Sequence, residues 1–225
     1  MCMSDKSRDL SSPPARIVRR EAENFIRLSL ASLAVPFTVI TDLVLTGNRL
    51  GERSVTEWSQ SLLLAVVVIL FADASRHARP HRGFYSLAAV FFACCLAREL
   101  DLWMDKFLYH GSWVLLALLF SALGLGLAWR YRETIIPGAA DFVGRRAYPF
   151  ILIGLVIILV LSRVLGSGHM LWNMLGCDDT HRLFKTIIQE SLESFGYLLF
   201  AFGAILLRRG QIKEKAETAC EDVRG

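Results

Sequence analysis

The sequence predicts an all-α fold: a polytopic membrane helix bundle with about six transmembrane helices and both the N-terminus and the C-terminus in the cytoplasm. Apolar residues make up 54% of the 225 residues. They come in blocks about as long as a bilayer is thick, and charged residues gather between the blocks. A soluble helical protein would instead spread its charges along one face of every helix. The distribution of apolar residues therefore favours a membrane protein.

The apolar blocks divide the chain into three regions. Residues 1–26 form a polar N-terminal tail, residues 27–207 the membrane domain and residues 208–225 a cytoplasmic C-terminal tail. Because mostly polar and basic residues precede the first block, we expect a retained span rather than a cleavable signal peptide. The expected spans lie near 27–46, 57–75, 84–106, 112–130, 148–166 and 187–207.

Local signals add detail to this map. Pro36 is expected to kink the first span. Ser54 followed by Glu57 forms a capping-box pattern, which marks a helix start. The connection 131–147 is long enough for a small surface helix. The amphipathic segment 14–27 fits an interfacial helix and an extension of the first span equally well, and the residues leave both open.

The orientation follows from the basic residues, because cytoplasmic loops carry an excess of lysine and arginine. With the N-terminus inside, the predicted inner segments hold 18 of the 25 lysines and arginines. Every inner connection then agrees with the rule, which supports an even number of spans. We expect the protein in a bacterial cytoplasmic (inner) membrane.

The outer third of the membrane domain is predicted to be acidic, with ten acidic residues against seven basic ones. Several of these charges lie inside predicted spans, where burial is costly. They are the candidate ligand-binding residues: Asp42, Arg98, Glu99, Asp101, Asp105, Arg163, Glu190 and Glu193.

The densest group stands at the outer end of the third predicted span. On a continuous helix, Arg98, Asp101 and Asp105 share a face, and Glu99 is turned away from it. Glu190 and Glu193 share a face at the start of the sixth span. All these residues fall at about the same membrane depth.

Two interpretations of this acidic end stay open. The functional one is a polar pocket open to the outer side that binds a cation, a proton or a lipid headgroup. The structural one is an ion-pair network, with Arg98 bound to Asp101 and Arg163 bound to Glu190. In addition, acidic residues in a first helical turn complement the helix dipole.

Other functional classes have weaker support. An accessory or scaffold subunit would pair its outer charges with a membrane protein partner or with a second copy of the chain. A metal-dependent membrane enzyme would use the outer histidines, which are His110, His169 and His181. His77 and His81 have metal-ligand spacing, but Pro80 interrupts the helix between them. No Walker loop, Rossmann fingerprint or GxSxG elbow occurs, so nucleotide binding and serine hydrolysis have no support, no nucleic-acid partner is expected, and the cofactor is left unknown. The lipid bilayer is the one expected partner that the fold class requires.

Two segments carry a resemblance. ARELDLWMDKF (97–107) and QESLESFGYLLF (189–200) resemble segments of uncharacterised multi-pass bacterial membrane proteins. In those proteins an acidic outer end of one span pairs with a glutamate-bearing final span. The resemblance covers about two helices and implies no activity.

Overall fold

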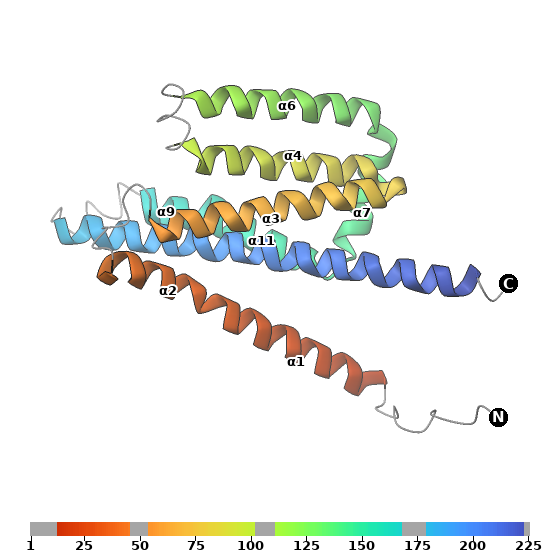
Figure 1. Cartoon of the computed structure of the whole chain (residues 1–225), viewed down its shortest axis with the longest axis horizontal. Helices are drawn as coiled ribbons and strands as arrows, with labels where there is room; N and C mark the ends of the chain where they lie inside the picture. The colour runs from red at the N-terminus through yellow and green to blue at the C-terminus, as the bar shows by residue number, and fades with distance from the viewer. Residues whose placement is uncertain (1–12, 46–53, 102–110, 168–178, 223–225) are drawn as a thin grey trace.

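The computed structural model describes residues 13–45, 54–101, 111–167 and 179–222, and all regular structure in these residues is helical. The longer helices run roughly along one axis, with α1 oblique to the others, so that the chain passes back and forth along a bundle (Figure 1). The passes are α1 (Pro13–Ser32) with α2 (Ala34–Ile40) and η1 (Thr41–Leu45), α3 (Val55–His77), α4 (Arg82–Glu99), α6 (Ser112–Arg130), α8 (Tyr148–Val156) with η4 (Ile157–Leu161) and α9 (Ser162–Ser167), and α11 (Asp179–Asp222).

Several of these passes can span a membrane. Five described segments are long and apolar enough to do so: Ala15–Val44, Val55–His77, Trp113–Arg130, Tyr148–Gly166 and Leu183–Ala216. The prediction of an all-helical, multi-pass membrane protein is confirmed to that extent. The remaining pass, α4, is 18 residues long and has charged residues at both of its ends. It covers the predicted third span as far as Glu99.

The local predictions agree with the structure. The first pass is interrupted between Ser32 and Ala34, one turn before Pro36, where the missing N–H removes a helical hydrogen bond. The segment 14–27 is helical and lies in α1, which continues into the first candidate span; the interfacial helix and the span extension both stay predictions. The Ser54 hydroxyl accepts a hydrogen bond of 3.1 Å from the backbone N–H of Glu57 and caps α3.

The connection 131–147 contains the predicted short helix. There, η3 (Arg132–Thr134) leads into α7 (Ile135–Val143), which crosses one end of the bundle (Figure 1). The last predicted span, 187–207, lies within α11. This helix has 44 residues and extends the predicted span at both ends, so it continues well into the predicted C-terminal tail.

Helix α11 lies at the centre of the bundle and packs against α2, α3, α8 and α9, whereas α4 packs between α3 and α6. The crossing of α8 and α11 depends on two glycines. A Cβ atom at Gly154 would lie 2.7 Å from a ring carbon of Phe200 and 2.9 Å from the Gly196 carbonyl oxygen. Small residues of this kind let membrane helices approach closely, where van der Waals packing replaces the hydrophobic effect.

Aromatic rings fill the middle of the bundle. The Phe92 ring centroid lies 5.1 Å from that of Phe71 and 5.0 Å from that of Phe200. Phe142 on α7 lies 6.1 Å from Phe71. These rings join α3, α4, α7 and α11, and each such pair contributes about 0.5–1.5 kcal/mol beyond its buried area.

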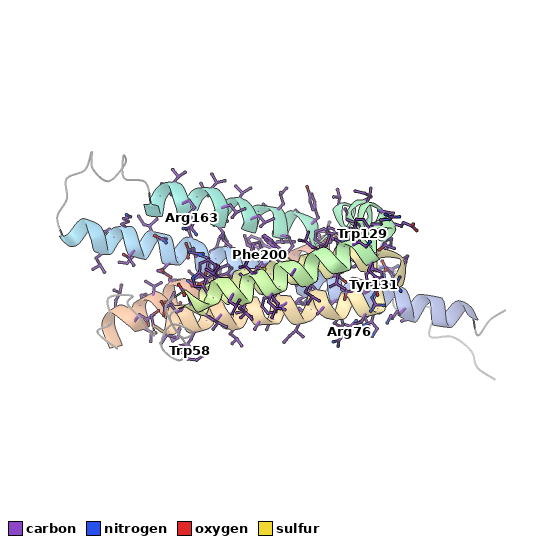
Figure 2. All side chains as sticks on the ribbon, turned by 90° about the horizontal axis from the view of Figure 1, so that it is seen from above. Trp58, Arg76, Trp129, Tyr131, Arg163 and Phe200 are labelled. Carbon is purple, nitrogen blue, oxygen red and sulfur yellow. The ribbon has the colours of Figure 1, made fainter. Side chains whose placement is uncertain are left out.

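The two ends of the bundle differ in charge. The carboxylate end holds Asp42, Glu57, Glu99, Glu190 and Glu193, and the arginine end holds Arg76, Arg82, Arg130, Arg145 and Arg208. Figure 2 shows Trp58 and Arg163 toward the carboxylate end, Phe200 near the middle, and Arg76, Trp129 and Tyr131 toward the arginine end. The described chain begins and ends at the arginine end, because α1 starts there and α11 finishes there (Figure 1).

We expect Gly196→Leu to lower the free energy of unfolding in detergent micelles by about 1–3 kcal/mol, because the added side chain would overlap α8. Gly126→Ala is the matched control, since no atom lies within 4 Å of a Cβ there. The control should keep or slightly raise stability. Equal stability of the two variants would contradict the close crossing of α8 and α11.

Candidate functional site

Asp42 joins the first pass to the second. Its carboxylate is fully buried in the π-helical turn η1. It accepts hydrogen bonds from the backbone N–H groups of Val55 (2.7 Å) and Thr56 (2.9 Å) and from the Thr56 hydroxyl (2.6 Å). A carboxylate at this position satisfies unpaired N–H groups and complements the positive end of the α3 dipole. These three donors give Asp42 a capping role, so its use as a ligand for another molecule stays a prediction.

Glu99 points from the last turn of α4 toward α11. The Tyr197 hydroxyl donates a hydrogen bond of 2.7 Å to its carboxylate. The Arg98 guanidinium lies 3.4 Å from the same oxygen, but the Arg98 side chain is 43% exposed. Glu99 therefore accepts a hydrogen bond from the neutral Tyr197 hydroxyl and also lies beside the partly exposed cation of Arg98.

Glu190 and Glu193 extend this group from α11. The Gln60 amide of α3 donates to the Glu190 carboxylate at 3.0 Å and to the Ser194 hydroxyl at 2.9 Å. Glu193 is 4% exposed and accepts from the Ser162 hydroxyl of α9 at 2.7 Å and from the Gln189 amide at 3.2 Å. Both carboxylates are held by neutral side chains.

These acids interact electrostatically with one another. Glu99 interacts with Glu193 and Glu57, and Glu190 interacts with Glu193, Glu99 and Glu57. We call Glu57, Glu99, Glu190 and Glu193 the carboxylate cluster. Its residues come from α3, α4 and α11, so only the tertiary fold brings them together.

The predicted arrangement of Arg98, Asp101 and Arg163 differs from the observed one. Helix α4 ends at Glu99, and Leu100 follows it with non-helical dihedral angles. The continuous helical face predicted for Arg98, Asp101 and Asp105 is therefore wrong at this point, and Asp105 lies outside the described residues. Arg163 is exposed on α9. The predicted Arg163–Glu190 pair is replaced by the hydrogen bond from Gln60 to Glu190.

Three functional candidates were missed in the sequence. Gln60, Ser162 and Tyr197 are polar residues inside apolar spans, and each binds a member of the carboxylate cluster. A signal for one of them was present, because Tyr197 stands four residues after Glu193 and so shares its helix face. Gln60 and Ser162 lie in other helices, and their spacing gives no indication of their partners.

A second group of polar residues lies at the arginine end of the bundle. Arg145 donates to both oxygens of Asp141 (2.7 and 3.1 Å) and to both oxygens of Glu214 (3.0 and 3.2 Å). The Tyr85 hydroxyl also donates to Asp141, at 3.2 Å. Burial alone would raise the pKa of the Asp141 carboxyl, but the hydrogen bonds and charge of Arg145 outweigh it and hold this pKa below its usual range. This Arg145 cluster (Tyr85, Asp141, Arg145 and Glu214) links α7 to α4 and α11.

Metal-binding geometry is absent from the part of the chain that the structure describes: no three His, Cys, Asp or Glu side chains are placed to hold an ion. His77 ends α3 and lies 3.0 Å from Asp73, and His81 follows in the short helix η2 (Arg79–His81). His110 and His169 lie outside the described residues. The predicted metal-dependent enzyme therefore gains no support from the described histidines.

Comparisons with known proteins give no relative: no family model matches the chain, and no curated protein or solved structure is detectably similar to it. The resemblance to bacterial membrane proteins accordingly stays a prediction.

We expect Asp42→Ala to lower the free energy of unfolding by about 2 kcal/mol, because two backbone N–H groups at the start of α3 lose their acceptor. Ser32→Ala is the control, since its hydroxyl bonds only to a carbonyl within its own helix. Unfolding in mixed micelles would measure both. A stable Asp42→Ala protein would exclude the capping role.

We expect Asp141→Asn to lower the stability at pH 7 by about 1 kcal/mol, as for other partly exposed ion pairs. Because the folded-state pKa of Asp141 lies below its unfolded value, its contribution is complete above the unfolded pKa and is lost as the pH falls through the folded pKa. The difference between the two proteins should therefore shrink in acid. Thermal unfolding from pH 7 to about pH 3 tests this; a constant difference would contradict it.

Proposed function

We propose that this chain is a six-span membrane protein with both termini in the cytoplasm, and that its carboxylate cluster binds protons from the outer side. The topology is supported by α4, which lies between two candidate spans, and by the start and end of the described chain at one end of the bundle. That end carries the arginines that an inner face should carry. The bacterial cytoplasmic membrane is the location that the sequence resemblance implies.

The observation that carries the proton proposal is the kind of partner each acid has. Glu190 and Glu193 are bonded by an amide and a serine hydroxyl, and Glu99 by the Tyr197 hydroxyl with the partly exposed Arg98 beside it. Buried carboxylates that lie close together cannot all be ionised, because each charge disfavours the others and burial disfavours them all. Protons shared within the cluster remove this excess charge.

A proton suits the site better than a metal ion does. Bound Ca²⁺ takes six to eight oxygen ligands, and transition metals require a defined geometry. The described acids have no such arrangement. Hydrogen-bonded carboxyl groups that share protons need only neutral donors and acceptors at hydrogen-bond distance, which Gln60, Ser162 and Tyr197 provide.

Access to the cluster is one-sided. Toward the middle of the bundle, Tyr197 is followed by the rings of Phe200, Phe92 and Phe71. This aromatic layer separates the cluster from the arginine end, and a proton path across the membrane would need polar groups along its length. The proposed activity is therefore proton uptake and release at the outer end, as in a pH-responsive protein, rather than conduction.

Infrared spectroscopy of the full-length protein in lipid vesicles tests this proposal. We expect the carbonyl stretch of at least one protonated carboxyl group at pH 7, and we expect the band to fade as the external pH is raised. In Glu190→Gln/Glu193→Gln, fewer carboxyl groups remain to share protons, so the band should weaken at pH 7. Glu133→Gln, an exposed acid at the other end, should leave the band unchanged.

Two results would contradict the proposal. Absence of a protonated carboxyl band between about pH 5 and pH 9 would mean that the cluster stays ionised. A band of unchanged intensity in a variant with all four cluster acids replaced by glutamine would place the protonated group outside the cluster. Thermal unfolding of each variant serves as the folding control, since glutamine keeps the size of glutamate and, like a protonated carboxyl group, is neutral and has both a donor and an acceptor.

A further inference from the structure

Three arginines gather around two aromatic rings at the arginine end. The Arg82 guanidinium lies 4.9 Å from the centroid of the Tyr131 ring, and that of Arg130 lies 5.8 Å from the same ring. Arg132 lies 5.8 Å from the Trp129 ring. The residues from Trp129 to Thr134 line a hollow of about 620 Å³. We call Arg82, Arg130 and Arg132 the arginine trio.

The trio has an excess of positive charge. Within the described residues, Arg82, Arg130 and Arg132 form no ion pair, whereas Arg145 and Arg208 at the same end are each bound to carboxylates. Glu133 is the acid that lines the hollow, and its side chain is exposed. The arginine trio and Glu133 together carry a net charge of +2, and guanidinium groups have the fork geometry that matches phosphate oxygens.

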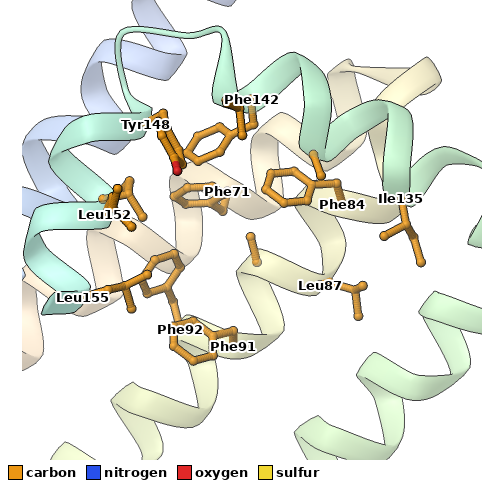
Figure 3. A pocket seen from close by; sticks show the side chains of 14 residues that line it. Phe71, Phe84, Leu87, Phe91, Phe92, Ile135, Phe142, Tyr148, Leu152 and Leu155 are labelled. Carbon is orange, nitrogen blue, oxygen red and sulfur yellow. The ribbon is translucent and has the colours of Figure 1, made fainter. Parts of the chain in front are cut away.

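An apolar groove lies beside this hollow. It has a volume of about 560 Å³ between α4, α7 and α8, and Figure 3 shows aromatic and aliphatic side chains around it. Phe91, Val143 and Leu152 line the groove and are 45%, 54% and 43% exposed, so it opens sideways from the bundle. In a membrane, that opening faces lipid.

The hollow and the groove meet at consecutive residues. Thr134 lines the hollow and Ile135 lines the groove. Both lie against the start of α4, where a Cβ atom at Gly83 would approach Thr134 to 2.7 Å and Ile135 to 3.0 Å. From Arg82 to Phe91 the helix rises about 14 Å, close to the depth of one bilayer leaflet. The groove therefore runs from the headgroup level toward the bilayer centre.

We propose that this combined site binds an anionic phospholipid, with its phosphate at the arginine trio and an acyl chain in the groove. Basic pockets between helices on the cytoplasmic side are suited to anionic headgroups, and Trp129 and Tyr131 lie at the depth where aromatic rings favour the interface. The apolar lining favours a lipid over a soluble phosphate compound, because an acyl chain in the groove would cover apolar side chains that are otherwise exposed.

Native mass spectrometry of the full-length protein in detergent tests the proposal. Phosphatidylglycerol and phosphatidylcholine with the same acyl chains are the two probes. We expect the wild-type protein to bind phosphatidylglycerol more tightly. Arg82→Gln/Arg130→Gln/Arg132→Gln should weaken this binding by about five-fold for each arginine removed and leave phosphatidylcholine binding unchanged.

A matched control separates the trio from the general positive charge of this end. Arg76→Gln/Arg209→Gln/Lys215→Gln removes the same charge from exposed positions and should keep the preference for phosphatidylglycerol. An equal loss in the control and the trio variant would overturn the proposal in favour of non-specific attraction. An unchanged preference in the trio variant would overturn it as well.

A substitution that fills the groove tests whether an acyl chain binds there. Ala139 lines the groove, and Ala139→Phe should weaken binding of long-chain phosphatidylglycerol at least five-fold while leaving the weaker binding of a six-carbon-chain analogue unchanged. Equal binding of the long-chain lipid by the wild type and Ala139→Phe would exclude an acyl chain in this groove. Thermal unfolding in neutral detergent confirms that each variant is folded before its lipid binding is compared.

Discussion

The free-energy cost of placing a charged side chain in the hydrocarbon of a membrane determines where this protein carries its charges. A charged side chain at the bilayer centre costs several kcal/mol, so it must reach an interface, find a partner or lose its charge. The described chain meets this constraint by moving its charges to the two ends of the bundle and filling the middle with aromatic rings such as Phe71, Phe92 and Phe200. The segregation of the two ends follows from that single constraint.

The two ends then neutralise their charges by different means. At the arginine end, Arg145 binds both Asp141 and Glu214, and opposite charges cancel within the Arg145 cluster. At the carboxylate end, Glu190 and Glu193 have neutral donors instead. An ion-pair network needs no further ligand, whereas under our proposal the acids with neutral donors are neutralised by protons. This contrast separates a structural cluster from a functional candidate, although both are rich in charge.

Helix α11 connects these two ends in one rigid element. It carries Glu190 and Glu193 near its start and Glu214 near its other end, and it crosses α8 where Gly154 and Gly196 allow close contact. Helix α11 therefore contributes residues to both the carboxylate cluster and the Arg145 cluster.

The sequence by itself determined the class of the protein and the local helix signals. Apolar blocks as long as a bilayer predicted the spans, Pro36 predicted the break in the first pass, and Ser54 predicted the start of α3, because these effects act within one or two helical turns. Only the tertiary structure decided which polar groups meet. Gln60 and Glu190 are 130 residues apart, and helix periodicity carries no information on contacts between helices. The orientation of Glu99 toward Tyr197 likewise depends on where α4 ends and on how closely α11 packs against it.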